Sequence, residues 1–232
     1  MRQVLKQGLG LLGLGIRQSV TPGVSAAGKN LFFDRVKERP RSAYALDSAL
    51  ELRPKTVLDV GSGGGEHARA FQAAGAQVTC VDFGTSVYSK ANNQDGLNVI
   101  HMDFTRYDLD ETFEMVWASH VLEHQHNVGM FIGKLLKASS RWVCITVPDP
   151  HRALWGGHVT LWTPGILAYN IVLAGADLSQ SQLIRGTKEF SILFEKAPVT
   201  LPSLSYDQGD IDRLSAFMPP GLTENSDGWK TW

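Results

Sequence analysis

The stretch VLDVGSGGGEHARAF, Val57–Phe71, decides the fold of this 232-residue chain. Apolar residues lead into a run with glycine at positions 61, 63, 64 and 65, and a helix-forming segment follows. Glycine lets the backbone turn sharply and approach a ligand, and the free N–H groups at a helix start favour an anionic group. A tight turn alone would not need four glycines in five residues. The stretch therefore predicts a strand, a ligand-binding loop and a helix.

The residues around the glycines narrow the choice of ligand. The dinucleotide fingerprint G-x-G-x-x-G requires a small residue where this chain has Glu66, whose charge would lie beside a pyrophosphate. The P-loop is excluded because no Gly-Lys-Ser/Thr follows. What remains is the pattern Asp59-x-Gly61-x-Gly63-x-Gly65, which resembles motif I of the class I S-adenosylmethionine-dependent methyltransferases.

Beyond this loop, short apolar runs alternate with helical segments. This alternation is typical of βαβ units around a buried parallel sheet. The expected fold class is α/β, a Rossmann-like doubly wound sheet that is mostly parallel with an antiparallel C-terminal hairpin, and the resemblance implies seven strands. Expected strands are 56–60, 76–83, 97–104, 113–119, 141–148, 178–186 and 188–196; expected helices are 66–75, 128–139 and 164–177, with a short helix or turn at 85–94.

The sequence divides into an N-terminal extension (1–29), a methyltransferase domain (30–196) and an irregular, proline-rich C-terminal tail (197–232). The extension imitates a signal peptide, since Arg2 precedes an apolar run, but that run is short and rich in glycine. It is also far shorter than the ~18 residues that a membrane span needs. We expect no transmembrane segment; a weak peripheral membrane contact of the N-terminus is the alternative to a flexible extension.

The resemblance covers about Thr56–Lys196 and implies S-adenosyl-L-methionine as the cofactor. Asp82 ends the second expected strand, where the family's acidic residue binds the two ribose hydroxyls. Asp103 ends the third, where the family has an Asp that contacts the adenine amino group, and Phe104 is expected to neighbour the adenine ring. The fourth strand continues into a V-L-E-H segment similar to that of small-molecule methyltransferases of this class. The expected cofactor-binding residues are Asp59, Gly61, Ser62, Gly63, Gly65, Asp82, Phe83, Asp103, Phe104, Ser119 and His120.

The segment ASHVLEHQHN, Ala118–Asn127, holds three of the seven histidines. Within it, His120-Val-Leu-Glu123-His124 fits the H-x-x-E-H pattern of the inverted zinc peptidases. A zinc site of that type needs both histidines on one helical turn and a third ligand. The preceding residues predict a strand instead, and no downstream Glu stands in an obvious ligand helix, so we expect no metal. In the family order, strands one and four are neighbours, which would place this segment opposite the glycine loop.

Methyl transfer to a hydroxyl gains from positioning and from a general base, a role that suits histidine near neutral pH. The candidates are His120, His124 and, from the loop after the fifth strand, His151 and His158. We hypothesise that His124 or His158 is the base; a purely structural role of this segment stays open. The expected function is methyl transfer to a small-molecule acceptor, with a sugar or polyketide-like hydroxyl favoured. The alternatives are C- or O-methylation of a quinone-type ring and a non-catalytic cofactor-binding scaffold.

Composition limits the partners and the location. A formal net charge of -1 and a pI near 6.7 give no basic footprint for nucleic acid. Cys80 and Cys144 each lie in an apolar, β-rich run and are expected to be buried, reduced thiols rather than a disulfide or a metal pair. Reduced thiols favour a cytoplasmic location. The sequence does not indicate an oligomeric state.

Overall fold

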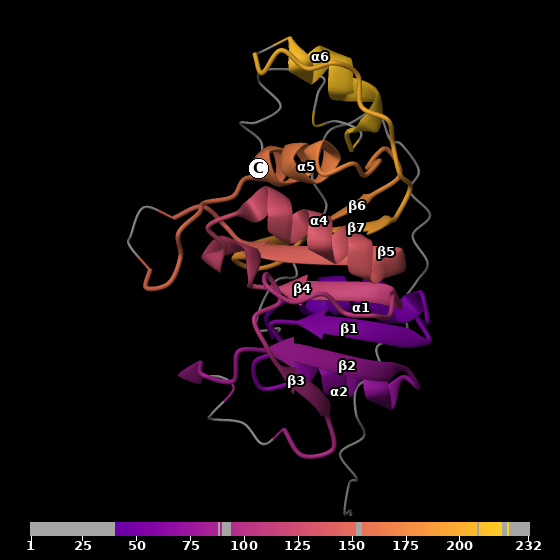
Figure 1. Cartoon of the computed structure of the whole chain (residues 1–232), viewed down its shortest axis with the longest axis vertical. Helices are drawn as coiled ribbons and strands as arrows, with labels where there is room; N and C mark the ends of the chain where they lie inside the picture. Colours follow the sequence, from indigo (N-terminus) through magenta and orange to yellow (C-terminus); the bar gives the residue numbers. More distant parts are fainter. Residues whose placement is uncertain are drawn as a thin grey trace, which may run out of the picture. The chain divides into compact units, whose positions relative to one another are not determined.

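Seven strands form one sheet in the order β3-β2-β1-β4-β5-β7-β6 in the computed structural model of the chain (Figure 1). Strands from β3 to β5 pair in parallel, whereas β7 pairs antiparallel with both β5 and β6. The expected α/β fold class is confirmed, with its antiparallel C-terminal hairpin. The strands are β1 (Thr56–Val60), β2 (Gln77–Asp82), β3 (Asn98–His101), β4 (Phe113–Ser119), β5 (Ser139–Pro148), β6 (Gln182–Arg185) and β7 (Glu189–Glu195).

The structure describes residues 40–87, 89, 94–151, 155–207, 209–219 and 222. The expected N-terminal extension, 1–29, lies outside these residues, as does much of the expected short helix or turn at 85–94. Among the described residues, no helix has the length and apolar character that crossing a membrane requires.

Side chains of the central strands alternate between two buried layers. In β4, Met115 and Trp117 pack on the same side as α1 and α2, whereas Val116 and Ala118 pack on the side of α4 and α5. Figure 1 shows α4 in front of the strands and α1 and α2 behind them. Because helices cover both faces, the strands read as nearly continuous apolar runs. The helices are α1 (Ala43–Glu51), α2 (Glu66–Ala73), α4 (Val128–Ala138), α5 (Pro164–Leu173) and α6 (Asp210–Leu214).

Two local features support this framework, and the second confirms the expectation of buried, reduced thiols. Thr163 caps α5, since its Oγ1 accepts a hydrogen bond from the N–H of Ile166 at 3.2 Å, and Pro164 follows in the first turn. Cys80 and Cys144 are free and buried, and both belong to the layer beside α1 and α2.

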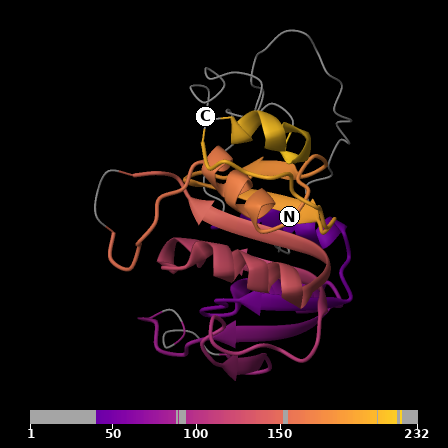
Figure 2. The same cartoon turned by 45° about the horizontal axis from the view of Figure 1, so that its top comes forward.

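Residues 197–219, expected to be irregular, include α6 and the 3₁₀ turn η2 (Ser215–Phe217). Leu214 joins the core cluster that contains α5, and Figure 2 shows α6 beside α5. Asp210 organises this segment, because its buried carboxylate accepts a hydrogen bond from the N–H of Ser205 at 3.0 Å. A one-turn helix fixed by such a contact is too short to leave a periodic apolar pattern in the sequence.

Strand order places the functional loops at one edge of the sheet. β1 and β4 are parallel neighbours, with Val60 opposite Ala118, so the glycine loop and the segment after β4 leave the sheet side by side. Ligands of open α/β sheets bind at the carboxyl ends of the strands, where the strand order reverses. The expected adjacency of strands one and four is therefore confirmed.

Candidate active site

The glycine loop is tied to the end of β2 by its own backbone. The N–H of Gly61 donates to the carbonyl oxygen of Val81 at 2.7 Å, and the N–H of Gly65 donates to that of Ser62 at 2.8 Å. Gly61 and Gly65 have φ angles of +73° and +79°, in the left-handed region that favours glycine. Gly65 is the N-cap of α2. The predicted strand, glycine loop and helix are present.

Val121, in the segment after β4, packs directly onto this loop. A Cβ atom at Gly61 would lie 2.2 Å from Cγ2 of Val121, well inside van der Waals contact. Glycine is thus required at position 61 for close approach as well as for φ. The contact fixes the exit of β4 against the loop that follows β1.

Asp82 at the end of β2 is held by three donors. Its carboxylate accepts hydrogen bonds from the N–H of Gly63 at 3.0 Å, the N–H of Gly84 at 2.7 Å and the hydroxyl of Ser89 at 2.6 Å. These bonds fix a negative charge beside the glycine loop. The next residue, Phe83, is exposed and leaves an aromatic face open at the same edge.

Two buried polar atoms at the loop have no hydrogen-bond partner among the residues that the structure describes: Oδ2 of Asp59 and Oγ of Ser62. Burial, followed by the neighbouring charges of Asp82 and Glu66, raises the pKa of the Asp59 carboxyl to about 7. An unpaired acceptor among several carboxylates is suited to a ligand that carries positive charge and hydrogen-bond donors.

The end of β3 differs from expectation. The strand stops at His101, and Asp103 lies in the turn that follows, where its carboxylate accepts hydrogen bonds from the hydroxyl and N–H of Thr105 at 2.6 and 2.9 Å. These bonds lower the pKa of Asp103. Phe104 is buried and packs edge-on against Phe131, with ring centroids 5.7 Å apart. The structure thus gives Phe104 a place in the core, and its contact with an adenine ring stays a prediction.

His120 lies between two carboxylates. Its Nε2 is 2.6 Å from Oε2 of Glu189 and its Nδ1 is 3.3 Å from Oε1 of Glu123. Burial disfavours the charged imidazole, but the two carboxylates outweigh burial and raise the pKa of His120 to about 9. A ring that is protonated near neutral pH has no lone pair to accept a proton, which argues against His120 as the general base. Its neighbour Ser119 pairs with the hydroxyl of Ser42 at 2.7 Å.

Glu189, at the start of β7, is a site residue that sequence reasoning missed. Its carboxylate contacts His120 and also accepts a hydrogen bond from the N–H of Ser42, directly before α1. A glutamate that begins an apolar strand carries no signal by itself. Its role depends on the pairing of β7 with β5, which places Glu189 opposite Pro148.

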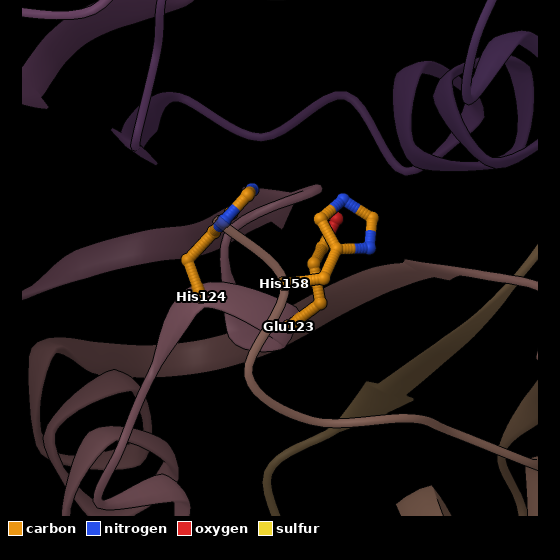
Figure 3. Close-up of side chains that lie close together, drawn as sticks. All are labelled: Glu123, His124 and His158. Carbon is orange, nitrogen blue, oxygen red and sulfur yellow. The ribbon is translucent and has the colours of Figure 1, made fainter. Parts of the chain in front are cut away.

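His124 and His158, the two favoured base candidates, lie together with Glu123. Their rings are edge to face with centroids 4.9 Å apart, and Figure 3 shows the carboxylate of Glu123 beside His158. Nδ1 of His124 lies 2.7 Å from the carbonyl oxygen of Gly157, and Nδ1 of His158 lies 3.3 Å from Nε2 of His151. Burial and the neighbouring imidazoles lower the pKa of His158, and they outweigh the charge of Glu123, which raises it.

A family model described as a methyltransferase domain matches residues 33–170, more than half of the chain. The chain belongs to this family: it is a class I S-adenosylmethionine-dependent methyltransferase. It is therefore an enzyme, and S-adenosylmethionine is its cofactor. The family assignment sets aside the non-catalytic scaffold.

Relatives with assigned names support the same family. The ubiquinone biosynthesis O-methyltransferase of Stutzerimonas stutzeri (strain A1501) is 30% identical over 173 residues, which span 71% of this chain and 68% of the relative. The enzyme of the same name from Actinobacillus pleuropneumoniae serotype 5b (strain L20) is 28% identical, over 68% of this chain and 67% of its own length.

Solved structures share the fold of this methyltransferase. The Burkholderia thailandensis 1,6-didemethyltoxoflavin-N1-methyltransferase, bound to 1,6-didemethyltoxoflavin and S-adenosylhomocysteine, has a TM-score of 0.54 at 22% identity. The alignment covers 68% of this chain and 77% of that chain. The TehB-like methyltransferase of Corynebacterium glutamicum gives a TM-score of 0.53 at 15% identity, over 69% of this chain and 90% of that chain.

The glycine loop of this methyltransferase fits its cofactor. S-adenosylmethionine carries positive charge on its sulfonium and amino groups, and its ribose hydroxyls are hydrogen-bond donors. Unpartnered Oδ2 of Asp59, unpartnered Oγ of Ser62 and the fixed carboxylate of Asp82 match these groups. Six of the expected cofactor residues lie together at the loop: Asp59, Gly61, Ser62, Gly63, Gly65 and Asp82. Their contacts with the cofactor remain predictions.

Proposed function

We propose that this methyltransferase O-methylates a hydroxyl group on a quinone-type aromatic ring. The observation that carries the proposal is the cluster of Glu123, His124 and His158 beside a loop that exposes apolar side chains. Trp155 and Leu161 of that loop are exposed, and such side chains suit a ring better than a highly polar acceptor. The names of the curated relatives support the same acceptor class.

The residues of the chain would share the work of methyl transfer. When bound, S-adenosylmethionine supplies a methyl group that is activated by its sulfonium. The glycine loop, Asp59 and Asp82 would hold the cofactor, and Val121 keeps the exit of β4 against that loop. The acceptor hydroxyl must lose its proton, and we place this step at the cluster of His124 and His158.

Calorimetry and turnover assays test the two halves of this proposal separately. Asp82→Ala should weaken S-adenosylmethionine binding, because it removes the acceptor that also orders Gly63 and Gly84. His158→Ala should retain cofactor binding but lower turnover by roughly 10²–10⁴-fold, the usual contribution of general acid–base catalysis. His126→Ala is the matched control, since His126 is exposed in the same segment.

The acceptor class is decided by the substrates that turn over. Hydroxylated aromatic precursors of quinones should be methylated on oxygen, as detected by mass spectrometry of the product. Methylation of sugars or polyketide hydroxyls alone would return the acceptor to the class favoured from the sequence. Full turnover of a ring hydroxyl by His158→Ala together with His124→Gln would remove the cluster from the reaction.

A further inference from the structure

We propose that Glu123, His124 and His158 form a binding site for a divalent transition-metal ion, for which Zn²⁺ is the best match. Each residue offers one ligand atom, and these atoms all lie within 4.8 Å of one another. Figure 3 shows the three side chains converging from two segments: the 3₁₀ turn η1 (Leu122–His124) and the loop before α5.

The carboxylate of Glu123 is only partly satisfied by its ion pair with His120. Glu123 is fully buried, yet neither carboxylate oxygen has a hydrogen-bond partner among the described residues. Leaving a buried carboxylate without such partners costs free energy. His120 provides a charge at 3.3 Å from Oε1, at ion-pair distance only, and a metal ion would complete the coordination of Glu123 from the side of His158.

The tautomer of His124 is fixed in the form that a metal ligand needs. A carbonyl oxygen can only accept, so the contact of 2.7 Å from Gly157 requires the proton of His124 to be on Nδ1. In the neutral ring, that tautomer leaves the lone pair on Nε2. Metal-ligating histidines usually have this arrangement, in which the second ring nitrogen donates to a carbonyl or carboxylate.

The two ligand-bearing segments are already joined by backbone hydrogen bonds. The carbonyl oxygen of Glu123 accepts from the N–H of Val159 at 2.8 Å and from that of Thr160 at 3.2 Å. These bonds hold His158 next to the turn that carries Glu123. The site therefore needs only a small side-chain adjustment. Tetrahedral ligands at ~2.0–2.1 Å from zinc lie about 3.3 Å apart, so the exposed His124 would move inward by roughly an ångström.

The donor set selects the type of metal. Two imidazoles and one glutamate form the three-ligand set of catalytic zinc sites, which keep a coordination position open. Mg²⁺ and Ca²⁺ prefer oxygen ligands and are disfavoured here. The set also differs from the H-x-x-E-H pattern. His120 forms an ion pair with Glu189 instead of acting as a ligand, and the third ligand is His158 from the loop before α5. This proposal revises the sequence-based expectation of no metal.

Occupancy of the site does not depend on the acceptor proposed above. Its catalytic consequence does rest on that proposal: a metal ion held by these residues would make the acceptor hydroxyl more acidic, so that its proton would be lost to solvent water while His124 and His158 would act as ligands rather than as bases.

Zinc titration of the full chain tests the inference. The protein is expressed without a polyhistidine tag, freed of metal with a chelator and titrated with Zn²⁺ by calorimetry. We expect one equivalent to bind, with affinity reduced at least about 10-fold in His124→Gln and in His158→Ala. His126→Gln should bind like the parent. Co²⁺ should produce visible absorption bands in the parent that are absent in His158→Ala, and Mg²⁺ should give no binding heat.

The decisive variant is His158→Ala, because Glu123 is buried and Glu123→Gln could unfold the protein. Circular dichroism and S-adenosylmethionine binding of the same samples verify the fold of each variant. Unchanged zinc affinity and stoichiometry in folded His158→Ala would overturn the proposal, as would a parent protein that binds no zinc. Loss of methyl transfer to ring hydroxyls with retained zinc binding would count against the proposed acceptor and leave the metal site intact.

Discussion

Gly61→Ala should destabilise the protein through two separable causes. The first is backbone conformation, since φ at Gly61 is +73°. The second is a steric clash, because the added Cβ would lie 2.2 Å from Cγ2 of Val121 and 3.3 Å from its Cβ. Both causes act where the glycine loop meets the exit of β4. The substitution therefore measures how tightly the two strand ends of the active site are coupled.

The magnitude of each cause can be worked from the structure. A left-handed conformation costs an alanine about 1–2 kcal/mol. Forcing a methyl group into a filled space typically costs about 1–3 kcal/mol. We expect Gly61→Ala to lower the free energy of unfolding by roughly 2–5 kcal/mol in total. Gly96→Ala is the matched control: its φ is +78°, but no atom lies within 4 Å of the added Cβ, so it should cost only the first amount.

Urea denaturation followed by tryptophan fluorescence provides the assay, and Val121→Ala completes a double-mutant cycle. Val121→Ala removes Cγ2, so the double variant should recover at least about 1 kcal/mol relative to the sum of the single losses. The cost of the left-handed backbone conformation at position 61 should remain in the double variant. Equal losses in Gly61→Ala and Gly96→Ala, or additive losses in the cycle, would show that the contact with Val121 carries no strain and would refute the reasoning.

Two further perturbations test the charges of the site. The pKa of Asp59 is about 7 in the folded protein and ~3.9 in the unfolded chain. Between these pH values the unfolded chain has lost the proton that the folded protein keeps, so the free energy of unfolding falls as pH rises. The loss is on the order of 4 kcal/mol at pH 8. Asp59→Asn should remove this fall, seen as a gain over the parent in urea midpoint that grows from pH 5 to pH 8; a constant difference would contradict the assigned pKa. His120→Ala should cost about 3–5 kcal/mol, since it leaves the carboxylates of Glu123 and Glu189 buried without their cation. Adding Glu189→Gln should recover part of that loss, and a purely additive loss would mean that His120 and Glu189 are not coupled.

The sheet was predictable because parallel strands buried on both faces need long apolar runs. The errors lie at strand ends, where local hydrogen bonds compete with the ladder. β3 was expected to reach residue 104 but stops at His101, since Asp103 bonds the N–H of Thr105 and starts a turn. β6 was expected from residue 178 but begins at Gln182, after Asp177 caps the N–H of Ser179 at 2.7 Å.

Site residues were predictable where one motif carries them, and not where two distant segments meet. The glycine loop and Asp82 follow from short patterns whose geometry is set by β1, β2 and α2. The meeting of Glu123 with His158 depends on backbone hydrogen bonds from the loop before α5, and that of His120 with Glu189 depends on strand pairing. Neither contact can be predicted from a sequence motif.

The charges around the glycine loop explain why a cationic cofactor suits this site. Burial, together with the charges of Asp82 and Glu66, raises the pKa of Asp59 to about 7, so part of the negative charge is suppressed in the free protein. A ligand with a sulfonium and an ammonium group would favour the ionised form of Asp59 and gain from it. The product S-adenosylhomocysteine lacks the sulfonium charge and would gain less. The energetic cost of burying the charged Asp59 carboxylate would thus favour binding of the cofactor over retention of its product.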